Sequence, residues 1–92
     1  MVRREIRVTG MVQGVGFRWF AQQNASRFGL TGWVSNQSDG SVMMEAQGDE
    51  RAVDAFTAEV SHGPRYARVE TVEIRALECE PEERSFRVQD YF

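Results

Sequence analysis

The chain has 92 residues and a mass of 10.5 kDa, so we expect residues 1–92 to form a single domain around one hydrophobic core. Hydrophobic residues make up 41% of the sequence and charged residues 27%, which is typical of a globular protein and excludes a disordered or membrane-spanning chain. The net charge of −3 is spread without long runs and argues against binding to nucleic acid or to an anionic membrane.

The residue types exclude several kinds of chemistry. The sequence contains no lysine, which excludes a P-loop nucleotidase, a Schiff base and a lysine general base. Cys79 is the only cysteine and His62 the only histidine, so no intrachain disulfide can form and a metal would find few ligands. We expect no metal and no other cofactor. Residues 1–10 are charged and no apolar segment is long, so we expect a cytoplasmic protein.

The first part of the chain predicts a strand followed by a helix. Residues 4–10 alternate the apolar Ile6 and Val8 with polar side chains, which is typical of a half-buried strand. Apolar residues then recur at helical spacing over residues 17–28, and Gly29 marks the end of that helix.

The middle of the chain predicts a hairpin followed by a second helix. Residues 30–35 and 42–46 alternate in the manner of strands around the turn-forming sequence of residues 36–40. Asp49 is suited to cap a helix, and Gly63-Pro64 to end it.

The last part predicts a strand over residues 69–77, an acidic turn over residues 78–83 and a short strand at residues 86–88. The whole order indicates an α+β fold, the ferredoxin-like βαββαβ sandwich, with both helices on one face of an antiparallel sheet and the first strand in a central position. This fold carries many functions and decides none of them.

The sequence GMVQGVGFR, residues 10–18, combines three glycines with an arginine at the start of a helix. Glycines allow the backbone N–H groups to curl around an anion, and the helix N-terminus adds a partial positive charge of about 0.5. Arg18 adds a full charge and two parallel donors, which suits a phosphate group. The alternative for this segment alone is a glycine-rich turn followed by a solvated arginine.

The same segment partly matches two other known motifs. Gly14 and Gly16 begin a dinucleotide-binding pattern, but Trp19 stands where its third glycine belongs. The sequence QGVGFRWF, residues 13–20, resembles an RNA-binding strand motif, but Gln13 replaces its cation and the segment follows the first strand instead of lying on the third. We therefore expect no nucleic-acid partner.

Two segments together resemble the acylphosphatase family: GMVQGVGFR at residues 10–18 and GWVSNQSDGSVMMEAQG at residues 32–48. The chain length and the order of elements agree with that family as well. The resemblance implies a metal-independent hydrolase that splits the carboxyl–phosphate bond of a small acyl phosphate into a carboxylate and inorganic phosphate. Ser35 departs from the family, which usually carries a longer, often basic residue there, and this bears on rate or substrate preference.

The resemblance also assigns roles to particular residues. Arg18 would bind the phosphoryl group, and Asn36 would position the attacking water. The backbone N–H groups that would share the phosphoryl group with Arg18 belong to Gln13, Gly14, Val15, Gly16 and Phe17. Read alone, Asn36 is better explained as a residue that starts a hairpin turn.

Acyl phosphate chemistry needs few catalytic groups. The leaving carboxylate has a conjugate acid with a pKa of about 4, so it departs without a general acid. Neither motif holds a candidate base, so our hypothesis is that a phosphate oxygen of the substrate accepts the proton of the water. The alternative function is a non-catalytic module of the same fold that binds a small anion or carbamoyl phosphate. No apolar stripe requires a partner chain, and we expect a monomer.

Four further residues carry side chains that could serve a function. Cys79 and Arg84 resemble a cysteine phosphatase loop, but the arginine comes one residue early and the neighbouring glutamates would repel phosphate. His62 is expected at a helix end, near the last carbonyl groups. Trp19 could stack on a ligand, although packing is the commoner role of a helical aromatic residue.

Overall fold

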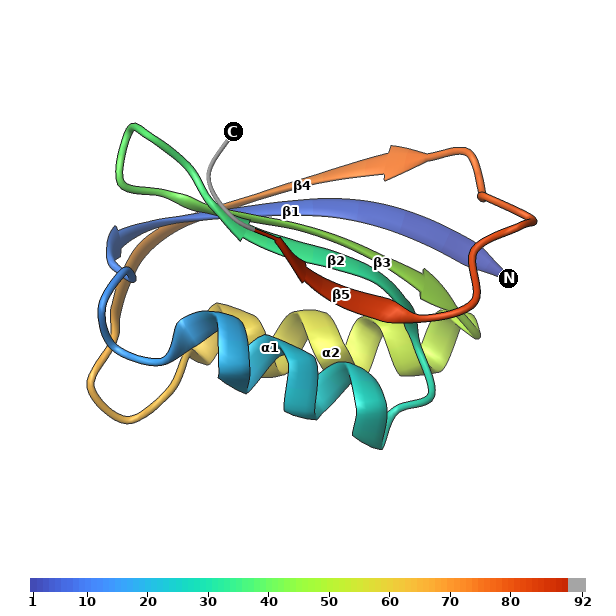
Figure 1. Ribbon diagram of the computed structural model, residues 1–92, viewed down its shortest axis with the longest axis horizontal. Coiled ribbons are helices and arrows are strands. Elements are labelled where there is room, and N and C mark those ends of the chain that lie inside the picture. The colour runs from blue at the N-terminus through green and yellow to red at the C-terminus, as the bar shows by residue number, and fades with distance from the viewer. Residues whose placement is uncertain (90–92) are drawn as a thin grey trace.

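A five-stranded sheet with two helices on one face forms the fold of the computed structural model, which describes residues 1–89 (Figure 1). Residues 90–92 of the predicted single domain lie outside the described residues. The elements in chain order are β1 (Val2–Met11), α1 (Phe17–Arg27), β2 (Thr31–Asn36), β3 (Val42–Gly48), α2 (Glu50–His62), β4 (Arg68–Leu77) and β5 (Phe86–Gln89). The predicted α+β fold with the βαββαβ order is confirmed.

The sheet order is β4-β1-β3-β2-β5, so β1 is an interior strand as predicted, although β3 holds the middle position. The four strands of the βαββαβ order pair antiparallel as predicted, and the short terminal strand β5, whose direction was not predicted, runs parallel to β2. β4 and β5 form opposite edges, and residues 78–85 cross one end of the sheet between them (Figure 1). After that crossing, β5 can only run back along the sheet in the direction opposite to β4, which is the direction of β2.

The hydrophobic core lies between the helices and the sheet. Ile6 and Val8 of β1 pack there with Phe17 of α1 and Phe56 of α2, and all four are buried. The alternation of β1 places these apolar side chains on the helical face and its polar ones on the other. The alternation of β3 likewise places Met44 in the core.

The predicted limits of the second helix are confirmed by its caps. The carboxylate of Asp49 accepts a hydrogen bond from the Arg51 backbone N–H at 3.2 Å. Gly63 ends the helix with φ of 83°, a conformation that side chains rarely adopt. His62 is the last residue of α2, as expected. Among residues 1–89, neither helix has the length and apolar character needed to cross a bilayer.

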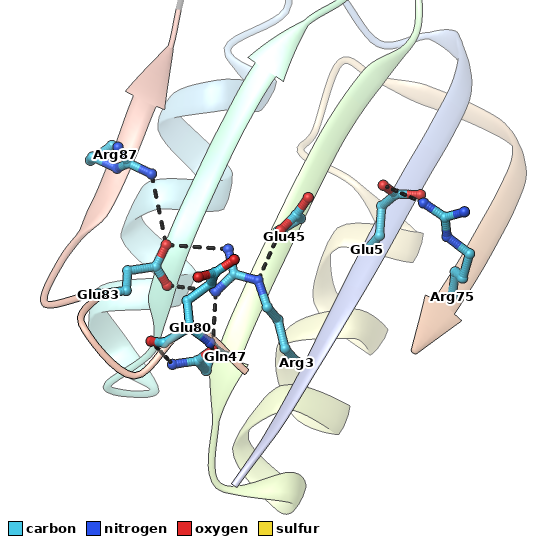
Figure 2. Close-up of polar contacts among 8 residues, drawn as sticks. All are labelled: Arg3, Glu5, Glu45, Gln47, Arg75, Glu80, Glu83 and Arg87. Atoms are coloured by element: carbon cyan, nitrogen blue, oxygen red, sulfur yellow. Dashed lines mark hydrogen bonds and ion pairs between the residues drawn. The ribbon is translucent and has the colours of Figure 1, made fainter. Parts of the chain in front are cut away.

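The open face of the sheet carries charged side chains that pair with one another (Figure 2). Arg3 is only 4% exposed; its guanidinium lies 2.8 Å from a carboxylate oxygen of Glu45 and binds Glu83 through two nitrogens at 2.8 and 3.2 Å. Burial alone would raise the pKa of Glu83, but the hydrogen bonds and charge of Arg3 outweigh it and lower that pKa. The Arg3–Glu83 pair thus fastens the segment before β5 to β1.

Candidate active site

A cleft of about 430 Å³ opens where the loop between β1 and α1 meets the end of β2. Residues from three separate parts of the chain line it. They are Val12, Gly14, Gly16, Phe17, Arg18, Trp19, Gln22, Asn36 and Val88. The cleft volume lies within the range of small-molecule sites.

The loop that forms one wall of the cleft owes its shape to two glycines. Gly14 and Gly16 have φ of 75° and 80°, in the left-handed region that costs other residues about 1–2 kcal/mol. A Cβ atom added to either would meet no atom within 4 Å. The backbone conformation, and not crowding, therefore requires glycine at these positions, and the backbone stays open to a ligand.

The N-terminus of α1 follows this loop and has no side-chain cap. Gly16 is the capping residue and no side chain accepts a hydrogen bond from the first turn, which also contains no acidic residue. The first hydrogen bond across this end runs from the N–H of Phe20 to the carbonyl of Gly16, at 3.0 Å. The N–H groups of Phe17 to Trp19 therefore lack carbonyl partners in the helix and can donate to an anion in the cleft.

Arg18 lies in the first turn of α1 and is half-buried on the cleft wall. No residue from 1 to 89 makes an ion pair or hydrogen bond with its guanidinium. Several other arginines, such as Arg3 and Arg7, are bound to carboxylates. The charge of Arg18 is thus available to a ligand.

Asn36 is the last residue of β2 and lies opposite Val42 of β3. The alternation of β2 places its side chain on the helical face, as it does that of Val34, so Asn36 is directed towards the layer that contains α1. The residue is only 6% exposed, yet within residues 1–89 its side-chain amide makes no hydrogen bond. A nearly buried amide without a protein partner on a cleft wall is suited to hold a water or substrate oxygen.

Gln13 joins the loop to the hairpin that carries Asn36. Its side-chain amide donates hydrogen bonds to the carbonyl oxygens of Gln37 at 2.8 Å and Ser41 at 2.9 Å. These two residues also pair with each other across the turn, from the Gln37 N–H to the Ser41 carbonyl, at 2.9 Å. The Gln13 amide therefore fixes the loop relative to the end of β2.

The hairpin turn is stabilised further by Asp39. Its carboxylate accepts hydrogen bonds from the Ser41 hydroxyl at 2.6 Å, from the Ser41 N–H at 2.9 Å and from Arg7 at 2.7 Å. The bonds from Ser41, together with that from Arg7, hold the pKa of Asp39 well below its usual range. The Asp39 carboxylate thus remains ionised at neutral pH and keeps these bonds to the turn.

The structure brings most of the sequence-predicted residues onto one cleft. Gly14, Gly16, Phe17, Arg18 and Asn36 all line it. The other two predicted residues, which lie in the same loop but do not line the cleft, are Gln13 and Val15. Their expected contribution is through backbone N–H groups and stays a prediction.

Other residues on the cleft were not identified from the sequence. Gln22 lies one helical turn after Arg18, so the spacing of the helix could have suggested it. Val88 reaches the cleft only because β5 pairs with β2, and no local pattern signals that pairing. Trp19, for which the sequence allows either stacking on a ligand or packing, lies on the cleft. Cys79 is exposed and not part of it.

Comparison with known proteins identifies the family. The fold is that of a ferredoxin-like α+β domain, and the acylphosphatase structure from Bacillus subtilis superposes on it with a TM-score of 0.92 and 35% identity over 97% of this chain and 99% of that one. An acylphosphatase from Oceanobacillus iheyensis is 48% identical over 86 residues, which are 92% of this chain and 94% of the relative. The acylphosphatase family model matches residues 4–88. The chain belongs to the acylphosphatase family.

The same domain also matches a small part of a longer protein. Full-length HypF in a phosphate- and nucleotide-bound form is 32% identical, with a TM-score of 0.89, over 98% of this chain but 12% of that one. The relatives that match along nearly their whole length are acylphosphatases. The comparisons thus support the hydrolase and give no support to the non-catalytic alternative.

Proposed function

We propose that this member of the acylphosphatase family hydrolyses small acyl phosphates in the cleft described above. Arg18 and the loop amides hold the phosphoryl group, and Asn36 orients the attacking water. One observation carries this assignment: Arg18 and Asn36 lie 18 positions apart in the sequence, line the same cleft, and neither side chain has a bonding partner among the described residues. Two polar groups left unbonded on one cleft are expected where a ligand supplies the missing partners.

The phosphoryl group needs positive charge and donors on several sides. The guanidinium of Arg18 can give two parallel hydrogen bonds, and a hydrogen bond to a charged group contributes about 1.5–3 kcal/mol. The N–H groups of residues 13–17 and the start of α1 face the remaining oxygens. In phosphoryl transfer, such positioning and charge stabilisation account for most of the catalysis.

The hydrolysis step itself then requires little from the protein. The water oxygen forms a bond to phosphorus while the bond from phosphorus to the carboxylate oxygen breaks. The amide of Asn36 can bind and aim the water, but it cannot accept a proton at neutral pH. The proton passes to a phosphate oxygen of the substrate, and the products are the carboxylate and inorganic phosphate.

The proposal also covers the setting in which the protein acts. We propose that the protein acts in the cytoplasm as a monomer. It consists of one domain over residues 1–92 and has no nucleic-acid partner. The net charge of −3, the single cysteine and the mutually paired charges of the open face support this setting.

The test is release of inorganic phosphate from benzoyl phosphate by the purified chain. Phenyl phosphate is the matched control, because it presents the same ring and phosphoryl group but leaves as a phenolate, with a conjugate-acid pKa of about 10 instead of about 4. We expect rapid hydrolysis of benzoyl phosphate and at least a hundredfold slower hydrolysis of phenyl phosphate. Equal rates for the two, or no release from benzoyl phosphate, would contradict the proposal.

A further inference from the structure

Two exposed apolar side chains, Trp19 and Val88, lie on the cleft beside the groups assigned to the phosphoryl end. Trp19 is 65% exposed and Val88 is 43% exposed. Within residues 1–89, the other large hydrophobic residues of comparable exposure are Met1, Met11, Tyr66 and Ile74, and none of them lines this cleft. Apolar side chains left open on a concave wall point to contact with a ligand.

Packing does not account for Trp19. Its neighbour Phe20 packs on the core, with its ring 6.1 Å from that of Phe17 in an edge-to-face arrangement. Trp19 is absent from the core cluster and lies on the cleft instead. At this point of α1 it is therefore Phe20, and not Trp19, that packs on the core.

The apolar residues lie next to the polar end of the cleft. Trp19 directly follows Arg18 in the first turn of α1. Val88 lies opposite Val34 in the parallel β2–β5 pair, and Val34 is two residues before Asn36 on the same face of β2. The cleft therefore has a polar end, formed by the loop with Arg18 and Asn36, and an apolar wall beside it.

The chemistry of an acyl phosphate matches this division. One bridging oxygen joins the phosphoryl group to the acyl group, so a substrate held by Arg18 places its acyl group a few ångströms away. Among residues 1–89, the cleft-lining side chains that are at least partly exposed and not assigned to the phosphoryl end are those of Trp19, Val88 and Gln22. An indole ring offers a flat apolar face of the kind on which another ring stacks. The Gln22 amide, which makes no hydrogen bond within residues 1–89, can donate to the acyl carbonyl oxygen.

We propose that Trp19 and Val88 form an acyl subsite that favours acyl phosphates with an aromatic acyl group over those with an acyl group of one or two carbons. This inference rests on the proposed function, because it requires the phosphoryl group to be held by Arg18. It assigns Trp19 and Val88 to substrate specificity and leaves the bond-breaking step to Arg18 and Asn36. A flat ring buries the exposed face of Trp19, whereas a methyl group leaves most of that face in water.

The experiment compares kcat/KM for benzoyl phosphate and acetyl phosphate. Trp19→Ala is expected to lower the value for benzoyl phosphate about tenfold and to change that for acetyl phosphate less than twofold. The loss is expected in KM with kcat nearly unchanged, because the ring is bound equally in the ground and transition states. Trp19→Phe is expected to restore most of the preference, and Val88→Thr to weaken it by about twofold to threefold.

Tyr66→Ala is the matched control, because Tyr66 is an aromatic residue of similar exposure away from the cleft. It should leave both substrates unaffected. If the wild type hydrolyses both substrates and Trp19→Ala leaves the ratio of the two kcat/KM values unchanged, the subsite is overturned. The proposed function then still stands. A wild type that hydrolyses neither substrate would overturn both.

Discussion

The side-chain amide of Gln13 donates a hydrogen bond to the carbonyl oxygen of Ser41 at 2.9 Å, from the loop between β1 and α1 to the far side of the β2–β3 turn. A second bond, to the carbonyl of Gln37 at 2.8 Å, completes the connection. These bonds fix the hairpin that carries Asn36 relative to the loop, and we expect Gln13 to act as a positioning residue. It needs no contact with substrate to do so.

Replacing Gln13 by alanine should lower kcat for benzoyl phosphate about tenfold, the equivalent of about 1.4 kcal/mol and so of one or two hydrogen bonds. The inhibition constant of inorganic phosphate should change less than threefold, because Arg18 and the loop N–H groups remain. Gln23→Ala removes an exposed amide from α1 and serves as the control. A loss of folding stability with kcat unchanged would show that Gln13 has a structural role only.

Removal of the Arg18 side chain should abolish both binding and turnover. Arg18→Ala is expected to weaken inhibition by inorganic phosphate at least tenfold and to lower kcat/KM at least a thousandfold, because the guanidinium carries the full positive charge of the site. Arg18→Lys should recover part of the binding but little of the rate, since an ammonium group lacks the paired donors. The measurements are phosphate inhibition and initial rates. Full phosphate inhibition in Arg18→Ala would assign the phosphoryl group to another part of the chain.

Removal of the Asn36 amide should separate turnover from binding. Asn36→Ala is expected to lower kcat by about a hundredfold to a thousandfold, in line with the loss of one preorganised polar group. The inhibition constant of inorganic phosphate should stay within twofold of the wild-type value. Equal weakening of phosphate binding in Asn36→Ala and Arg18→Ala would contradict the division of roles between them.

A substitution at Gly16 should strain the loop without any steric clash. Gly16→Ala is expected to lower the free energy of unfolding by about 1–2 kcal/mol, the cost of holding a residue with a Cβ atom in the left-handed conformation. Urea denaturation measures this loss. Arg18 remains in the variant. If the loop N–H groups have turned away from the cleft, a stabilising cosolvent is therefore not expected to restore kcat/KM. A stability equal to the wild type would mean that the loop tolerates another conformation.

The Arg3–Glu83 pair should make stability depend on acid. The pKa of Glu83 is lowered in the folded state, so its stabilising contribution is complete above the ordinary glutamate pKa of about 4.3 and disappears as pH falls through the lowered value. Glu83→Gln should cost about 1–3 kcal/mol at pH 7 and should flatten the loss of stability on acidification. Urea denaturation from pH 7 to pH 3 tests both effects. Glu82→Gln, at an exposed neighbouring position, is the control and should change neither.

Much of the fold could be predicted because its signals are local. The alternation of Ile6 and Val8 identified β1, and the cap at Asp49 with the stop at Gly63 identified α2. The direction of β5 could not be predicted in this way, since four residues carry no information about the strand they pair with. The antiparallel pairing predicted for the other four strands is confirmed.

The same difference between local and long-range signals separates the site residues that the sequence could predict from those that it could not. Arg18 and Asn36 stand in recognisable motifs, so the sequence alone was sufficient to propose them. The side-chain role of Gln13 was missed because a glutamine in a loop does not reveal that its partners are backbone carbonyls more than 20 residues away. Val88 was missed as part of the cleft for a related reason: its position there depends on a long-range pairing.

The pairing of β5 with β2 has a consequence for how this chain is studied during folding. A species that has formed its first four strands but not docked the last one can already present the loop and Asn36, because neither belongs to β5. Such a species retains Trp19 on α1 but lacks the wall formed by Val88, so it should discriminate less well between aromatic and short acyl phosphates and gain the rest of its preference when β5 docks. The ratio of the two rates, followed through a refolding time course, would then report the docking of a single strand without any attached probe.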